Sequence, residues 1–384
     1  MRLKRLLCML LCSVAFLSGC SKTENSVTNT SEKSINAGYF GNYCKLVEGD
    51  SGYYIMDTLY PYAISFIEKG TDKRIYLCGK PDCEHDDGRG GVLTTCNSYV
   101  GEIMLSSLQY HDGWLYMLSY DRATYNVSLS RISKDGVAHE SLGVIDHASC
   151  NQDTFSYVIV GDKVYYTQKL DSNDSTNKAY ILEISLSTKE IREIYSYESY
   201  QCGIAQLKYY NNYLYFKEIN NDLCGLSRLE LTTGKRESLV DSHVSGYTIN
   251  ASRNQLLCWI SGAGMYKLDL GNMTSDFVES CNNNSYYIDL ACDDKYIYLS
   301  NVRNKYYSDD QSFENSITIL DLNGKQVGVI SLENMKAVRV TPICITEDRI
   351  YIETVVEDVG RVYAYMDKEK MFSQDARFIN VQKQ

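Results

Sequence analysis

Proline is scarce in this 384-residue chain, which holds only 3 Pro, and no apolar run beyond the N-terminus is long enough to cross a bilayer. The 25 Gly are scattered, which excludes a collagen-like or low-complexity chain. Hydrophobic residues make up 44% and charged residues 23%, so the chain has enough apolar surface to fold. A formal net charge of −11 argues against nucleic acid and against an anionic lipid surface as partners.

Several catalytic signatures are also missing. The sequence has no Gly-x-Ser-x-Gly elbow, no His-Glu-x-x-His, no P-loop and no dinucleotide fingerprint. We therefore assign no catalytic residue and expect a protein without an intrinsic reaction. The acidic pairs Asp86-Asp87, Asp293-Asp294 and Asp309-Asp310 leave one alternative open, because two carboxylates can supply the acid and the base of a glycosidase.

The N-terminus has the three parts of a secretory signal. Met1 to Arg5 is basic, Leu6 to Phe16 is apolar, and Leu17-Ser18-Gly19-Cys20 follows at once. This ending resembles the lipobox of bacterial lipoproteins, in which the cysteine receives a diacylglyceryl group and becomes the new N-terminus. The resemblance implies a signal peptide over 1–19, lipidation of Cys20 and a location on the extracytoplasmic face of the bacterial cell membrane. Residues 20–37 are then the lipidated cysteine and a polar, flexible tether.

A repeat runs through the rest of the chain, residues 38–384. Seven times, a turn containing Asp, Asn or Gly precedes a short apolar and aromatic strand, at a spacing of roughly fifty residues. The aligned first apolar positions of these strands are Tyr53, Leu115, Val164, Leu214, Leu256, Ile297 and Ile350. A period near fifty predicts an all-β chain folded as a single β-propeller domain of four-stranded blades. Seven blades is the preferred number, and six or eight remain compatible with the spacing.

The unit around residue 160 shows the expected blade most completely. Strands are predicted over 155–160, 163–170, 180–185 and 191–195, with turns at Gly161-Asp162 and Thr188-Lys189. The 34 Tyr, against 9 Phe and 2 Trp, suit such strands, and adjacent pairs such as Tyr53-Tyr54 place one ring on each face. Most of these rings are expected to fill the space between blades.

One strand resembles a known repeat. Val164-Tyr165-Tyr166-Thr167-Gln168 is similar to the Tyr-Trp-Thr-Asp repeat of low-density-lipoprotein-receptor-type propellers, although Trp is absent from the second motif position. The whole mature chain resembles β-propeller lipoproteins of Gram-positive bacteria, whose function is unknown. The resemblance implies a propeller on a lipid anchor and transfers no ligand.

Cysteine supplies the one local cluster. Of 14 Cys, two lie in the signal and one is Cys20, so an odd number remains in the mature chain. Most are interpreted as small buried apolar residues. Cys78, Cys83, His85 and Cys96 lie close together in an insert at 78–96, and a loop with Gly88, Gly90 and Gly91 could fold back to close a structural zinc site. A disulfide from Cys83 to Cys96 is the alternative.

These features predict a membrane-anchored extracytoplasmic lipoprotein that acts as a binding or scaffold module. Its expected partners are the membrane, through the lipid, and a glycan, peptide or protein ligand. The alternative is a secreted glycan-processing hydrolase or lyase with an acidic site at the mouth of the propeller channel, and a third interpretation is a sensor or assembly partner of a membrane complex. An enzyme would bring carboxylates or histidines together near the propeller axis, whereas a binding module would present an aromatic or flat polar face.

Overall fold

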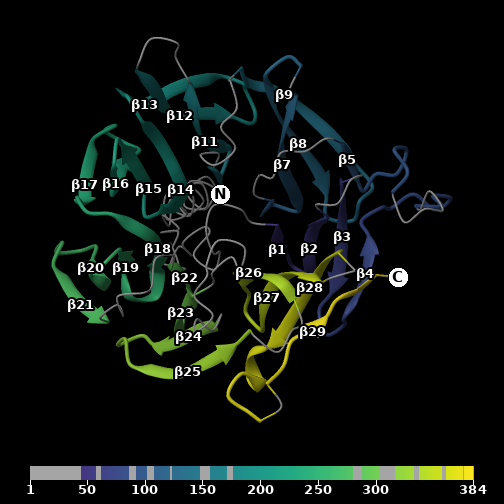
Figure 1. Ribbon diagram of the computed structural model, residues 1–384. Helices are drawn as coiled ribbons and strands as arrows, with labels where there is room; N and C mark the ends of the chain where they lie inside the picture. Colours follow the sequence, from purple (N-terminus) through teal and green to yellow (C-terminus); the bar gives the residue numbers. More distant parts are fainter. Residues whose placement is uncertain are drawn as a thin grey trace, which may run out of the picture. The chain divides into compact units, whose positions relative to one another are not determined.

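Seven sheets, built almost entirely of antiparallel pairs, are arranged in a ring in the computed structural model (Figure 1). The structure describes residues 45–57, 62–85, 92–101, 108–121, 123–147, 156–170, 176–279, 288–301, 316–332, 337–356, 360–374 and 376–383. Cys20, the signal peptide and the tether therefore lie outside the described residues. Each sheet is one blade whose strands follow one another in chain order, which confirms the predicted seven-bladed β-propeller.

The first two strands of every blade form an antiparallel hairpin. The first strands, which lie nearest the centre of the ring in Figure 1, are β1 (Leu46–Glu48), β6 (Gln109–His111), β10 (Ser156–Val160), β14 (Cys202–Tyr210), β18 (Val244–Asn250), β22 (Ile288–Cys292) and β26 (Ala337–Ile345). The second strands are β2 (Gly52–Asp57), β7 (Trp114–Asp121), β11 (Lys163–Leu170), β15 (Tyr213–Asn220), β19 (Gln255–Ile260), β23 (Tyr296–Asn301) and β27 (Arg349–Val356).

The outer half of every blade is a second hairpin. The third strands are β3 (Tyr62–Glu68), β8 (Asn126–Ser133), β12 (Asn177–Ser185), β16 (Leu223–Glu230), β20 (Gly264–Asp269), β24 (Ser316–Asp321) and β28 (Gly360–Asp367). The fourth are β4 (Lys73–Tyr76), β9 (His139–His147), β13 (Ile191–Ser199), β17 (Arg236–Val240), β21 (Ser275–Glu279), β25 (Gln326–Ser331) and β29 (Ile379–Asn380). Two short strands, β5 (Tyr99–Gly101) and β30 (Gln382–Lys383), complete blade 1. The described helices are the single turns η2 (Ala251–Arg253) and η5 (Lys368–Lys370), and within the described chain no helix is long and apolar enough to cross a membrane.

The repeat identified in the sequence marks one equivalent place in all seven blades. Each aligned residue lies on the second strand of its blade and is 0% exposed: Tyr53, Leu115, Val164, Leu214, Leu256, Ile297 and Ile350. The spacing was readable because each blade must bury the same strand between its two neighbours.

Alternating side chains on one strand pack against different neighbouring blades. On β10, Tyr157 and Ile159 join the apolar cluster shared with blade 2, whereas Val158 joins the cluster shared with blade 4. The same division separates Tyr53, which packs against blade 7, from Tyr54, which packs against blade 2. The core is thus a series of apolar layers between blades, as the period of two along a strand requires.

Tyrosine is favoured over phenylalanine because its hydroxyl reaches the backbone of the next blade. The hydroxyls of Tyr157 and Tyr247 donate to the carbonyls of Tyr116 and Tyr215, each at 2.8 Å. Tyr363 of blade 7 donates to the carbonyl of Met56 in blade 1, also at 2.8 Å. The rings fill the interblade space while the hydroxyls satisfy buried carbonyls, which confirms the packing role expected for most tyrosines.

The C-terminus closes the ring on its outer side. After β29 of blade 7, the chain crosses to blade 1, where β30 pairs in parallel with β4 (Figure 1). Val381, between these strands, is buried and donates its N–H to the carbonyl of Tyr363 at 2.8 Å. A salt bridge between Lys45 and Glu353, with an N–O distance of 2.7 Å, joins the same two blades.

Candidate metal centre and interblade pocket

The Cys-rich insert interrupts the outer edge of blade 1. Strand β4 pairs with one half of β3 and β5 with the other half, and the insert connects β4 to β5. Ile64 on β3 holds both ends: its carbonyl accepts from the N–H of Leu77, and its N–H donates to the carbonyl of Ser98, each at 2.9 Å. Both ends of the insert are therefore fixed at one residue of β3.

The structure brings together the four residues that the sequence singled out in this insert. The potential ligand atoms of Cys78, Cys83, His85 and Cys96 all lie within 4.8 Å of one another. Cys96 is buried and its Sγ lies 3.5 Å from Nδ1 of His85, while the other three residues are partly exposed. The glycines Gly88, Gly90 and Gly91, expected to close the loop, lie outside the described residues.

Local backbone contacts orient these side chains. The carbonyl of His85 accepts from the N–H of Leu93, and the carbonyl of Leu93 accepts from the N–H of Cys96, both at 2.9 Å. His85 has a φ of 55°, a left-handed conformation that is uncommon outside glycine. Leu93 and Cys96, on the far side of the undescribed residues 86–91, thus lie directly beside His85.

The thiols of this cluster differ in their acidity. Burial raises the pKa of Cys96 to about 11, although its contacts with Ser98 act in the opposite direction. Burial also acts to raise the pKa of Cys78, but hydrogen bonds from the backbone of Lys80 and Asn97, together with those from the thiols of Cys96 and Cys83, outweigh it, so the net shift is downward. Backbone N–H groups therefore favour a thiolate at Cys78.

The insert and the residue that follows it form hydrogen bonds with blade 2. Gly79 donates its N–H to the carbonyl of Gly136 at 3.1 Å, in the turn between β8 and β9. The side-chain amide of Asn97 donates to the carbonyls of Gly136 and Val137, at 2.7 and 2.9 Å. The cluster consequently lies where blades 1 and 2 meet.

The remaining described cysteines behave as the sequence interpretation expected. Each is buried and lies on a strand: Cys202, Cys224, Cys258, Cys292 and Cys344. Burial raises the pKa of Cys258 and Cys292 to about 12, so they stay protonated and apolar at neutral pH. Cys44, Cys150 and Cys281 lie outside the described residues.

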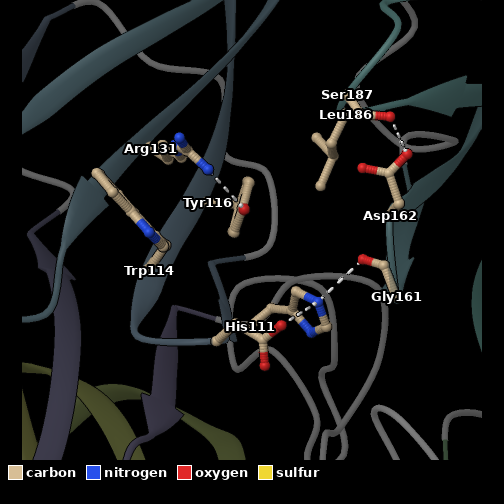
Figure 2. A pocket seen from close by; sticks show the side chains of 9 residues that line it. His111, Trp114, Tyr116, Arg131, Gly161, Asp162, Leu186 and Ser187 are labelled. Atoms are coloured by element: carbon tan, nitrogen blue, oxygen red, sulfur yellow. Dashed lines mark hydrogen bonds and ion pairs between the residues drawn. The ribbon is translucent and has the colours of Figure 1, made fainter.

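A pocket of about 430 Å³ opens between blades 2 and 3 (Figure 2). Blade 2 contributes His111 and Asp112 from the end of β6, Trp114 and Tyr116 from β7, and Arg131 from β8. Blade 3 contributes Gly161 and Asp162 from the turn before β11, and Leu186 and Ser187 after β12. The pocket exists because two hairpin turns from neighbouring blades lie side by side.

One wall of this pocket is flat. The guanidinium carbon of Arg131 lies 4.0 Å from the ring centroid of Trp114, and its Nη1 donates to the Tyr116 hydroxyl at 3.3 Å (Figure 2). Glu140 accepts from Nε and Nη2 of Arg131, at 2.9 and 2.7 Å, and holds the guanidinium in place. Such a planar, partly apolar wall suits a ring or a flat side chain of a ligand.

The rest of the pocket is rich in hydrogen-bond acceptors. Nε2 of His111 lies 3.0 Å from the carbonyl of Gly161, which links the two blades, and 3.4 Å from a carboxylate oxygen of Asp112 (Figure 2). Asp162 accepts from the hydroxyls of Ser187 and Ser185, at 2.6 and 2.9 Å, and these hydrogen bonds lower its pKa. A flat wall beside carboxylates favours binding of a donor-rich ligand.

Sequence reasoning missed this pocket. His111, Asp112 and Trp114 directly precede the aligned repeat position Leu115, and Asp162 is part of a predicted turn, so neither group suggested a binding site. The signal in the sequence that could have indicated a binding site was Trp114, one of only 2 Trp, which directly follows a turn and begins a strand. No motif connects it to Asp162, because the two residues come from different blades.

One acidic position considered for catalysis, Asp293, has a structural role. Asp293 accepts from the backbone of Lys295 and Tyr296, both at 2.7 Å, from the Tyr298 hydroxyl at 2.8 Å and from Lys368. Burial raises the pKa of Asp289 on β22, against the opposing effects of Lys217 and Lys208. Asp293 therefore stabilises a turn, and the charges that influence Asp289 are lysines. The pairs Asp86-Asp87 and Asp309-Asp310 lie outside the described residues.

Comparison with known proteins identifies the fold and no family. No protein-family profile matches the sequence, and no curated protein matches it. Among solved structures, a prolyl endopeptidase is similar with a TM-score of 0.61 and 10% identity, over 89% of this chain and 50% of that one. The present chain thus spans half the length of that enzyme.

Two further solved structures align with lower TM-scores. A structure of a nidogen/laminin complex aligns with a TM-score of 0.41 and 13% identity, over 76% of this chain and 92% of that chain. BamB from Moraxella catarrhalis aligns with a TM-score of 0.45 and 10% identity, over 85% of both chains. At such identities the likeness concerns the β-propeller fold alone.

Proposed function

We propose that this protein is a lipid-anchored extracytoplasmic binding or scaffold module, and that it captures a glycan, peptide or protein partner in the pocket between blades 2 and 3. The observation that carries the proposal is the planar wall of Trp114 and Arg131 facing the carboxylates of Asp112 and Asp162. A flat wall accepts the face of a sugar ring or of a planar side chain, while carboxylates accept hydrogen bonds from hydroxyl or ammonium groups.

The charge of the protein supports a donor-rich ligand. The chain has a formal net charge of −11, and Arg131, the cation of the pocket, is already bound to Glu140. The carboxylates of Asp112 and Asp162 interact with His111 and with two serine hydroxyls, and their remaining acceptor capacity favours hydroxyl groups of a glycan or basic side chains of a peptide or protein.

The two tryptophans of the chain allow a direct test of this pocket. Replacing the buried Trp259 by Phe leaves Trp114 as the only fluorescent indole. This variant is titrated with neutral oligosaccharides and with peptides containing Arg or Lys, and we expect a saturable change in emission with one of the two sets. Asp112→Asn in the same background should weaken binding by roughly tenfold, since a hydrogen bond to a charged group contributes about 1.5–3 kcal/mol.

The substitution at Asp112 has a structural advantage and a matched control. Asp112 has a φ of 46°, a conformation that asparagine also adopts, so the turn should be retained. Asp222→Asn, at an exposed turn of blade 4, should leave binding unchanged. The pocket assignment is refuted if neither ligand set changes the Trp114 emission. It is also refuted if Asp112→Asn binds the ligand as tightly as the protein with Asp112.

The anchor is tested separately. Replacing Cys20 by Ala should abolish incorporation of labelled fatty acid and release the protein from the membrane fraction. Cys12→Ala, inside the apolar run of the signal, is the matched control and should keep both properties. A Cys20→Ala protein that still carried fatty acid would contradict the proposed anchor without affecting the pocket.

A further inference from the structure

We propose that Cys78, Cys83, His85 and Cys96 bind one zinc ion, which fastens the outer edge of blade 1 to blade 2. Three thiols and one imidazole meet with all four ligand atoms inside 4.8 Å. These side chains come from both ends of the insert, three from its first part and Cys96 from the segment that leads back into β5. The short spacing of the first three in the sequence and the return of the chain towards β5 together bring the four side chains to one place.

One separation within the cluster matches a tetrahedral metal site. With Zn–S bonds of about 2.3 Å and Zn–N bonds of about 2.0–2.1 Å, sulfur and nitrogen ligands of one ion lie about 3.5 Å apart. The Sγ of Cys96 and the Nδ1 of His85 are 3.5 Å apart. The imidazole nitrogen is thus in position to coordinate the ion together with that sulfur.

The composition of the cluster favours zinc over a disulfide. A disulfide would use two of the three sulfurs and would leave the third thiol and the imidazole without a role. Three sulfurs and one nitrogen in tetrahedral arrangement are the usual ligands of structural zinc, and four protein ligands leave no open position for a substrate. The site is consequently structural, and thiolates at the cysteines would be stabilised by the ion's charge.

The contacts around the cluster indicate what the ion would hold. The apolar side chains grouped around the insert form a small cluster in which only Ala63, Val92 and Cys96 are buried. Yet the insert makes three hydrogen bonds to the turn at Gly136 and Val137, through Gly79 and Asn97. Gly79 directly follows Cys78, and Asn97 directly follows Cys96. A bond from each of these cysteines to the metal would fix the neighbouring contact with blade 2.

The first measurement is the metal content of the full-length protein, extracted in detergent and purified without chelator or reductant. We expect about one zinc per chain. After zinc removal under reducing conditions, added cobalt(II) should produce the visible absorption of a tetrahedral ion with sulfur-to-cobalt charge-transfer bands. Chelation should lower the thermal unfolding midpoint and expose the insert to protease.

Substitutions assign the ligands. Cys83→Ser and His85→Ala should each reduce the bound zinc by at least several-fold, whereas His85→Cys should retain it, because four thiolates also form a structural zinc site. Cys224→Ser, at a buried thiol of blade 4, is the control and should retain one zinc. The proposal is overturned if the unaltered protein neither contains zinc nor binds cobalt after reduction. It is equally overturned if two of the three thiols are oxidised in the native protein and reduction leaves no metal binding.

Discussion

The side-chain amide of Asn97 donates to the carbonyl of Gly136 at 2.7 Å, across the boundary between blades 1 and 2. The same amide donates to Val137 at 2.9 Å, so one residue of the Cys-rich insert satisfies two acceptors in a turn of the next blade. The loop at the outer edge of blade 1 therefore contacts blade 2 through Asn97.

Replacing Asn97 by Ala removes both hydrogen bonds. We expect the free energy of unfolding to fall by roughly 1–2 kcal/mol, because each such bond contributes about 0.5–1.5 kcal/mol. Urea denaturation followed by tryptophan fluorescence measures the change. Thr94→Ala, at an exposed position of the same insert, should change stability by less than about 0.5 kcal/mol, and an equal effect of the two substitutions would contradict the contact.

The turn that receives these bonds permits a comparison of two glycines with the same backbone angle. Gly136 and Gly234 both have a φ of 70°. A Cβ at Gly136 would lie 2.6 Å from the carbonyl oxygen of Leu77, whereas a Cβ at Gly234 meets no atom within 4 Å. Gly136→Ala should therefore destabilise by roughly 2–4 kcal/mol and Gly234→Ala by about 1 kcal/mol.

The difference between the two variants measures how closely blade 1 approaches blade 2. Thermal or urea unfolding of both proteins under one set of conditions gives this difference directly. Equal destabilisation would show that the insert does not press against the turn at Gly136.

Asp293 should make stability depend on acidic pH. Burial acts to raise its pKa, but the hydrogen bond and charge of Lys368, with the N–H groups of Lys295 and Tyr296, lower it overall. A carboxyl with a lowered pKa in the folded state stabilises the fold above its unfolded value of about 4, and this contribution is lost as the pH falls through the folded pKa. Asp293→Asn should cost roughly 2–3 kcal/mol at neutral pH.

The pH dependence distinguishes this effect from a general loss of packing. The difference between Asp293→Asn and the unaltered protein should shrink as the pH falls below about 4, when the native carboxylate also loses its charge. Asp294→Asn, at the exposed neighbouring position, should follow the unaltered protein at all pH values. Urea midpoints measured across this pH range test the expectation, and a constant difference would refute the ionic role.

Because the C-terminal residues close the ring, a substitution at Val381 should strongly lower the free energy of unfolding. Val381 is 8% exposed and packs with residues of blades 1 and 7, so Val381→Asp would bury a charge and should cost at least about 3 kcal/mol. Asn380→Asp, at the adjacent exposed position, should have little effect. Similar unfolding midpoints for the two variants would mean that the last residues do not contribute to closure.

Much of the fold was predictable because the determining signals are local. In the blade around residue 160, the predicted strands 155–160 and 163–170 correspond to β10 (Ser156–Val160) and β11 (Lys163–Leu170). Alternation along each strand and turn residues at Gly161-Asp162 act over a few residues, so they are visible without tertiary contacts. The third strand begins earlier than the predicted residue 180. Strand β12 starts at Asn177, because pairing with β13 extends it beyond its apolar part.

The candidate sites were predictable to different degrees for the same reason. The four residues of the Cys-rich cluster lie within one insert, so the spacing of Cys78, Cys83, His85 and Cys96 was sufficient to nominate them. The pocket was not predictable, because Trp114 and Asp162 come from turns of separate blades and only the packing of those blades brings them together. The contact between Asn97 and Gly136 was not predictable either, because these residues also belong to different blades.

The amino-acid sequence by itself determined the seven strand repeats, the buried position in each and the four clustered Cys and His residues of the insert, because periodicity and short spacing are properties of nearby residues. Tertiary structure alone decided which blades meet, that tyrosine hydroxyls bind carbonyls across them, and that the insert binds blade 2 rather than standing free. Those relationships depend on the angle and distance between sheets, which closure of the ring imposes on all blades at once.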